Sequence, residues 1–153
     1  MFDTFQLSSV FAVVAVLSSL ALLGYFSWKT LRTSNLFQKG ITLYQQENYK
    51  SAEATFRQVI AINSTNDVVR LLLGDTLMQQ GKVEEATQQF QDVINRAPKK
   101  VDAYLRLSNA LMRLEKKESA IATLEQARDL LQAQRQAQKL EEVNRVLEKL
   151  KKS

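Results

Sequence analysis

Residues 73–98, LGDTLMQQGKVEEATQQFQDVINRAP, decide the fold because their pattern recurs at a fixed distance along the chain. Ala86 has counterparts at Ala52 and Ala120, each 34 residues away (86 − 52 and 120 − 86). Four other positions repeat at the same interval: Gly40, Gly74, Ser108; Leu43, Leu77, Leu111; Phe56, Phe90, Leu124; and Val59, Val93, Ala127. This period is typical of a solenoid of helical pairs, in which each pair buries its apolar face against the next.

The periodicity of the apolar residues after residue 33 is helical throughout, with no useful length of strand-like alternation. It predicts helices at about 34–46, 50–62, 67–80, 84–96, 101–114, 118–132 and 136–151. We therefore predict an all-α protein with a solenoid of three helical repeats over residues 31–132. The repeats are expected at about 33–66, 67–100 and 101–132, followed by a C-terminal capping helix within 133–153.

Small residues recur at positions where two helices are expected to come close. Gly40 and Gly74 lie in the middle of predicted helices, where each costs about 1 kcal/mol relative to alanine. A helix tolerates that cost where another backbone must approach, and the two glycines are one period apart. The three repeated alanines support the same expectation, because a small side chain lets the second helix of each pair lie against the first.

The last predicted helix carries an apolar stripe formed by Leu140, Val143, Leu147 and Leu150, with charged residues opposite. Such a stripe suits a terminal capping helix, which needs an apolar face to pack on the last repeat and a polar face exposed to solvent. It also suits a helix that dimerises or docks a partner, and this alternative stays open. No Gly or Pro separates this helix from the one before it, but we expect a short turn near 133–137.

The N-terminal segment, residues 1–30, is predicted to be a single transmembrane helix. Residues 4–28 contain no charge, and a helix of that length is about 37 Å long, enough to cross a hydrocarbon core of about 30 Å. Tyr25 and Trp28 lie at one end of the segment, where aromatic rings settle at the headgroup level.

A cleaved signal peptide is the alternative, but it requires a basic leader and a short apolar core. This chain begins Met-Phe-Asp, and its apolar run is too long. Lys29, Arg32 and Lys39 follow the run instead, so the positive-inside rule predicts a translocated N-terminus and a cytoplasmic or stromal repeat domain. The bilayer contact is expected through residues 4–28.

The composition argues against catalysis and against metal binding. The 153 residues include no Cys and no His, which removes disulfides, thiolate nucleophiles, imidazole bases and the usual zinc ligands. No paired constellation of Asp, Glu, Lys or Tyr is recognisable in a likely cleft. We therefore expect a protein that is not an enzyme and that binds no cofactor, metal or small-molecule substrate.

The chain has a formal net charge of +5. Its basic residues are scattered and are not interleaved with aromatic residues, as they are in proteins that bind single-stranded nucleic acid. We therefore expect no nucleic-acid partner. An anionic lipid surface close to the repeats explains the positive net charge better than nucleic-acid binding does.

The repeats resemble the tetratricopeptide-repeat (TPR) family, which places Leu-Gly, Tyr, Ala-x3-Phe and Pro at set intervals. The middle repeat matches best, with Leu73-Gly74, Leu77, Ala86, Phe90 and Pro98. The first repeat keeps Gly40, Tyr49, Ala52 and Phe56; the third keeps Tyr104, Leu107, Leu111 and Ala120. The resemblance covers about residues 34–132 and implies a right-handed superhelix that binds partner proteins.

In this family, the first helix of each pair lines a concave face that holds a peptide or helix of a partner. The positions that the resemblance assigns to this groove are Phe37, Ile41, Tyr44, Val68, Leu71, Asp75, Met78, Gln79, Leu105, Asn109, Met112 and Arg113. The groove would be unusually apolar, with two adaptable methionines. The alternative is that Phe37, Ile41, Leu71 and Leu105 are ordinary core or are covered by the last helix.

One subtype of the family is disfavoured. Repeat domains that grip the acidic tails of Hsp70 and Hsp90 use a clamp of Lys, Arg and Asn. The matching positions here hold Phe37, Ile41, Leu72, Asp102 and Arg106. Only Arg106 fits, and one guanidinium does not neutralise several carboxylates.

An anchor followed directly by three repeats is similar in layout to the membrane-anchored TPR proteins that assist photosystem I assembly in cyanobacteria and plastids. That similarity implies a thylakoid protein whose partners are subunits or assembly intermediates of a membrane complex. The alternatives are an adaptor of a secretion, envelope or respiratory complex in a bacterial inner membrane, or a permanent accessory subunit. The sequence leaves these open.

Overall fold

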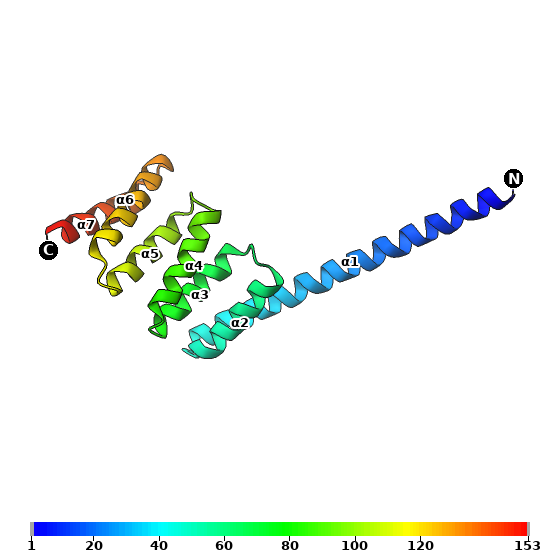
Figure 1. The fold of residues 1–153 in the computed structure, drawn as a ribbon, viewed down its shortest axis with the longest axis horizontal. Coiled ribbons are helices and arrows are strands. Elements are labelled where there is room, and N and C mark those ends of the chain that lie inside the picture. The colour runs from blue at the N-terminus through cyan, green and yellow to red at the C-terminus, as the bar shows by residue number, and fades with distance from the viewer. Residues whose placement is uncertain (1, 153) are drawn as a thin grey trace.

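The computed structural model describes the backbone of residues 2–152 and the side chains of residues 11–152. Every regular element in that range is an α-helix. The helices are α1 Phe2–Gln45, α2 Tyr49–Ile62, α3 Asp67–Gln79, α4 Val83–Arg96, α5 Val101–Arg113, α6 Lys117–Ala133 and α7 Ala137–Lys152. They stack side by side in chain order, while the first half of α1 projects from the stack as a rod (Figure 1). The all-α superhelix is confirmed.

The predicted bounds of α2 to α7 agree with the structure to within one residue at each end. The first predicted helix differs, because α1 does not begin near residue 34 but continues without a break from the N-terminal segment. Residue 30, where we place the end of the anchor, lies inside a helix of 44 residues. As a limit between domains that position stays a prediction, but it is not a break in the helix.

The turn within each pair uses the same backbone geometry. Glu47, Gly81 and Glu115 adopt left-handed conformations with φ of 59°, 75° and 58°, and they are one period apart. The amide after each of them donates back to a leucine carbonyl five residues earlier, at 2.9–3.0 Å. This closure satisfies carbonyls that a helix end would leave unpaired. Only the middle repeat has glycine at this position, where glycine carries no steric cost.

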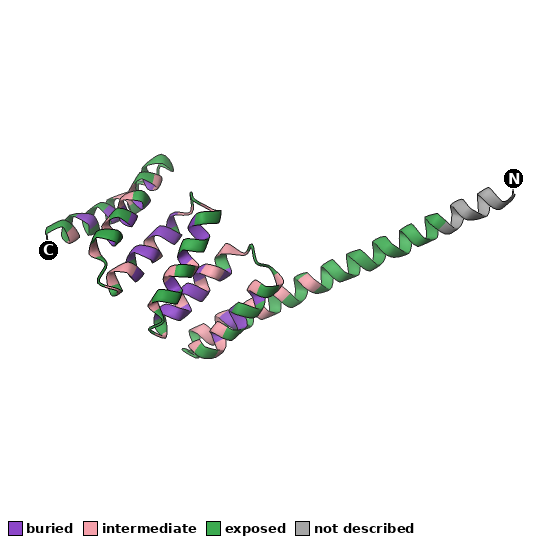
Figure 2. Cartoon of the chain, viewed as in Figure 1, coloured by how far each residue is buried: buried purple, intermediate pink, exposed green. Residues whose placement is uncertain are grey.

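The core repeats as the sequence pattern requires, with Ala52, Ala86 and Ala120 fully buried. Figure 2 shows buried residues on the inward sides of the packed helices. A Cβ built on Gly40 would overlap the ring of Phe56, and one on Gly74 would overlap the ring of Phe90. The close approach predicted at the glycines is therefore real, but an aromatic ring of the partner helix makes it rather than a backbone.

The last helix is separate, as predicted, because a turn at residues 134–136 divides α6 from α7. Arg135 there has a φ of 57°, and the Gln136 amide donates to the Leu131 carbonyl. Val143 and Leu147 of the apolar stripe are buried against the core, and Leu140 and Leu150 pack beside them. The stripe thus covers the end of the third repeat and is not free to bind another chain.

The N-terminal half of α1 is exposed along its described length (Figure 2). From residue 11 to residue 28 every side chain is exposed, and the large apolar ones are all more than half accessible. By length and composition, Phe11–Gln45 is the one helix among the described residues that could cross a membrane. Such helices occur both in anchors and in signal sequences, and residues 4–10 of the predicted bilayer segment have no described side chains. The anchor therefore stays a prediction.

Candidate partner-binding groove

The first helices of the three pairs converge on one hollow. It has a volume of about 100 Å³ and is lined by Tyr44, Asp75, Met78, Gln79, Phe90, Arg106, Asn109 and Arg113. Six of these eight residues are among the twelve predicted from the sequence. Because the lining comes from α1, α3, α5 and α4, the hollow crosses all three repeats. We call these eight residues the groove.

An ion pair links two walls of the groove. The Arg106 Nε of α5 donates to both carboxylate oxygens of Asp75 on α3, at 2.9 and 3.0 Å. Burial raises the pKa of Asp75 above its usual value, although the hydrogen bond and positive charge of Arg106 act in the opposite direction. The pair links neighbouring repeats, and the Asp75 carboxylate offsets the positive charge of Arg106.

Tyr44 closes one end of the groove. Its ring meets the Tyr49 ring edge to face, with centroids 5.5 Å apart. Burial raises the pKa of the Tyr44 hydroxyl, and the negative charge of Asp75 raises it further. The phenol is therefore a neutral group that can both donate and accept a hydrogen bond at neutral pH.

Arg113 lies at the other end, on α5, and contacts Met78 of α3. The Arg113 Nη1 donates to the main-chain carbonyl of Met78 at 3.1 Å. The Met78 side chain is only 6 % exposed, so it forms the floor and is not a free contact. Gln79, Asn109 and Arg113 are exposed and remain accessible to a partner.

The other six predicted residues are distributed differently. Leu71 is buried in the core, while Phe37, Ile41 and Leu105 are partly buried and pack against it. Met112 is half-buried, and Val68 is 51 % exposed. Core packing, the alternative we left open, holds for Leu71 in full and for Phe37, Ile41 and Leu105 in part. Whether any of the twelve binds a partner stays a prediction.

Two groove residues were not predicted. Phe90 belongs to a second helix, and the sequence pattern identifies it only as core. Arg106 was considered only as a clamp residue. A period of 34 residues pairs Asp75 with Asn109, so the sequence gives no sign that Arg106, one turn earlier on α5, reaches that carboxylate. Its bond to Asp75 argues further against a clamp for acidic tails.

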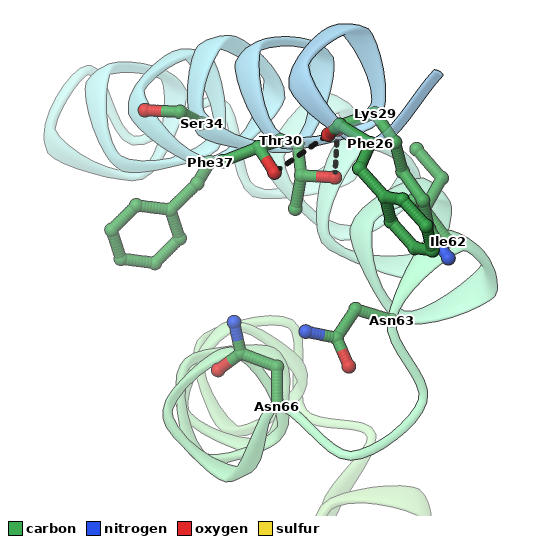
Figure 3. A pocket seen from close by; sticks show the side chains of 9 residues that line it. Phe26, Lys29, Thr30, Ser34, Phe37, Ile62, Asn63 and Asn66 are labelled. Atoms are coloured by element: carbon green, nitrogen blue, oxygen red, sulfur yellow. Dashed lines mark hydrogen bonds between the residues drawn. The ribbon is translucent and has the colours of Figure 1, made fainter. Parts of the chain in front are cut away.

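A larger hollow, of about 500 Å³, lies outside the groove, where α1 passes the end of α2 (Figure 3). Its lining is Phe26, Lys29, Thr30, Thr33, Ser34, Phe37, Ile62, Asn63 and Asn66. Asn63 and Asn66 lie between the helices predicted at about 50–62 and 67–80. The sequence does not indicate that they face the predicted end of the anchor, because that contact depends on how α2 packs on α1.

Comparison with known proteins defines the class. The sequence pattern of the tetratricopeptide repeat matches residues 43–99 and 81–143, which is more than half of the chain. The chain belongs to the tetratricopeptide-repeat family. It is a protein-interaction scaffold of the TPR type.

Solved structures share the fold at low sequence identity. The TPR2B domain of yeast Sti1, solved in complex with pHsp70, is 17% identical with a TM-score of 0.73, covering 80% of this chain and 98% of its own. PcrH from Pseudomonas aeruginosa is 18% identical with a TM-score of 0.72, covering 78% and 91%. The Yersinia enterocolitica chaperone SycD, in complex with a peptide of the translocator YopD, is 17% identical with a TM-score of 0.66, covering 78% and 94%. No curated protein sequence matches the chain significantly.

Proposed function

We propose that this protein is a membrane-anchored TPR scaffold that helps to assemble a membrane protein complex by holding partner subunits in the groove. One observation carries the proposal: a single uninterrupted helix, α1, contains both the exposed apolar segment and the first wall of the groove. Tyr44 lies 16 residues after Trp28 (44 − 28), which corresponds to about 24 Å along a helix. The groove is thereby kept close to a bilayer surface.

The chemistry of the groove suits a peptide or helix of a protein partner. It offers an apolar floor at Met78 and Phe90, an internal ion pair between Asp75 and Arg106, and exposed polar side chains at its rim. Solved TPR structures of the same fold include complexes with partner peptides. We propose binding without catalysis, and the described residues contain no cluster of three or more metal-ligating side chains.

The complex that we propose is photosystem I, with the repeats on the cytoplasmic or stromal side of a thylakoid membrane. Support comes from the layout of one anchor and three repeats, which resembles the membrane-anchored assembly proteins. An adaptor or accessory subunit of another bacterial inner-membrane complex is the second candidate, since the same layout serves it equally.

Affinity purification from native membranes separates these candidates. An assembly factor is expected to recover intermediates of photosystem I after crosslinking, and little mature complex. Stoichiometric recovery in a purified mature complex would identify a permanent subunit instead. Recovery of secretion, envelope or respiratory proteins without photosystem subunits would replace photosystem I by the second candidate.

The groove is tested by filling it without disturbing the core. Gln79→Trp with Asn109→Trp places two large rings at exposed positions, and we expect at least a tenfold loss of partner capture, about 1.4 kcal/mol. Charged substitution of Met78 is unsuitable, because a charge at a buried position unfolds the repeat. Gln88→Trp with Gln126→Trp, at exposed positions of α4 and α6, is the matched control. Capture that survives in the first variant would show that the partner binds elsewhere.

A further inference from the structure

We propose that the hollow between α1 and the α2–α3 loop binds the anionic headgroup of a membrane lipid. This inference rests on the proposed anchoring of α1 and assigns a second ligand to the protein, distinct from the partner in the groove. The hollow lies where the exposed apolar segment of α1 ends, since Phe26 and Lys29 form one wall and Ile62, Asn63 and Asn66 form the other (Figure 3).

The two asparagines present hydrogen-bond donors to this space. The Asn66 Oδ1 accepts from the Val69 amide at 3.2 Å, and the Asn63 Oδ1 accepts from the Thr65 amide at 3.3 Å and the Thr65 hydroxyl at 2.9 Å. Because the oxygens are engaged by their own loop, the amide NH₂ groups face away from it. Figure 3 shows both nitrogens directed into the gap beneath α1.

The charge around the hollow is positive and unneutralised. Lys29 has no ion-pair partner among residues 11–152, and its side chain extends beside the Phe26 ring toward Ile62 (Figure 3). No acidic residue occurs from Thr4 to Gln46. Asp67, beside Asn66, is already bonded to the Arg96 guanidinium. A group that enters the hollow therefore meets donors and one cation but no free carboxylate, which favours an anion.

The apolar part of the lining accounts for a lipid rather than a soluble anion. Phe26 and Ile62 border the hollow on the side of the exposed apolar segment, and Phe37 borders it farther along α1. On the adjacent face of α1, a second hollow is lined by Tyr25, Trp28, Arg32 and the end of α2. The Arg32 guanidinium lies 5.3 Å from the centre of the Trp28 ring. Aromatic rings and basic side chains at one level of a helix are typical of the headgroup region.

The single tryptophan provides the measurement. The full-length protein is placed in nanodiscs of an equal mixture of phosphatidylglycerol and phosphatidylcholine, with bromine on the acyl chains of one lipid or the other. Quenching of Trp28 then reports which lipid lies beside Lys29. We expect phosphatidylglycerol to be preferred about fivefold, as for one cationic side chain near an anionic surface.

The decisive variant is Asn63→Asp with Asn66→Asp, which retains both acceptor oxygens while it replaces the donors by negative charge. We expect the preference to disappear. Asn48→Asp is the matched control, because Asn48 caps α2 as Asn66 caps α3 and lies at the opposite end of α2. It should leave the preference unchanged. If the double variant does not fold, Lys29→Gln replaces it, with the same expected loss.

The remaining outcomes are equally informative. A preference that survives in the double variant, or that Asn48→Asp reduces equally, would show a general charge effect and no site. Loss of the preference on addition of inorganic phosphate would identify a soluble anion as the ligand and overturn the lipid proposal. Equal quenching by both lipids would overturn the lipid site while leaving the anchor intact. Absence of quenching by either lipid would refute the anchor as well.

Discussion

At the scale of single residues, the repeat depends on pairs of one small and one large side chain. The Phe56 and Phe90 rings, both fully buried, occupy the space that a Cβ would need at Gly40 and Gly74. In the third repeat the same two positions hold Ser108 and Leu124. Leucine is less bulky than phenylalanine, which explains why the third repeat accepts a side chain at the glycine position.

This pairing predicts coupled effects of mutation. Gly74→Ser should destabilise the domain by about 2 kcal/mol, because overpacking against a buried ring outweighs the gain in helix propensity. Phe90→Leu should cost about 1–2 kcal/mol through lost burial. The double variant has the same two residues as the third repeat. Its loss of stability should be smaller, by at least about 1 kcal/mol, than the sum of the losses in the two single variants. Thermal unfolding followed by circular dichroism gives the stability of the wild type and the three variants. If the two single losses of stability simply add in the double variant, the proposed pairing is contradicted.

Glu53 joins the first two repeats through a partly buried carboxylate. Its side chain, 12% exposed, accepts hydrogen bonds from Lys82 at 2.8 Å, Gln80 at 2.9 Å and Arg57 at 2.9 Å. Burial alone would raise the pKa of Glu53, but these three donors outweigh it and lower the pKa to about 2 from 4.5. The carboxylate therefore stabilises the folded state in its charged form.

The sign of the pH dependence follows. Because the folded pKa is lower than the unfolded one, the stabilisation is fully present above pH 4.5 and is lost as the pH falls toward 2. Glu53→Gln should cost about 1–2 kcal/mol at neutral pH, and the difference from the wild type should shrink across that window. Glu84→Gln, at an exposed position of α4, is the control. A difference that is constant down to pH 2 would exclude this role for Glu53.

At the scale of secondary structure, the main finding is the continuity of α1. The helix contains both the apolar segment and the first helix of the first repeat. Gly40 and Gly24 are its only glycines, and it contains no proline. A helix without a break transmits orientation, so the groove is expected to keep a set angle to the membrane normal.

Asn35→Pro tests that rigidity, because proline removes a helix hydrogen bond and clashes with the preceding turn. Asn35 is exposed, and proline is accepted in the first turn of the helix that would restart there. The repeats should therefore stay folded while the anchor turns freely. The chain has no native cysteine, so spin labels at Ala21→Cys and Gln126→Cys report one distance directly.

The wild type and the control Asn35→Ala should give a narrow distance distribution between the two labels. The proline variant should give a broad one, with little change in the melting temperature of the repeats. A broad distribution in the wild type would show that α1 does not hold the repeats at a set orientation. The proposed placement of the groove would then lose its physical basis.

At the scale of the whole molecule, the protein is a linear stack in which helices pack mainly on their neighbours in the chain. Stability in such a stack is a sum of local terms and interface terms between neighbouring repeats. α7 supplies the last interface by burying Val143 and Leu147 against the third repeat. A defect in the cap should therefore act most strongly at the C-terminal end.

Leu147→Ala should cost about 2–4 kcal/mol, because the side chain is 4% exposed and its removal leaves a cavity. Amide hydrogen exchange should accelerate in α6 and α7 while α2 keeps its protection. Val146→Ala, where the native side chain is 45% exposed, should change stability by less than about 0.5 kcal/mol. Uniform acceleration throughout the chain would show that the repeats unfold as one unit.

The sequence by itself determined the repeat, the bounds of α2 to α7, the separate capping helix and six of the eight residues that line the groove. These features depend on neighbours along the chain: the 34-residue period sets the core register, and apolar spacing sets the helical faces. Tyr44, Asp75 and Asn109 could be placed in the groove because the resemblance to the family assigns their positions to the concave face.

Only the tertiary structure decided that α1 is continuous, that Met78 is a buried floor, that Asp75 bonds Arg106, and that Asn63 and Asn66 line one hollow with Lys29. The last three of these depend on the angle and offset at which two helices pack. The period of the sequence is the same for several such arrangements, so it does not distinguish between them. Side chains far apart in the chain meet only when the helices that carry them are in place.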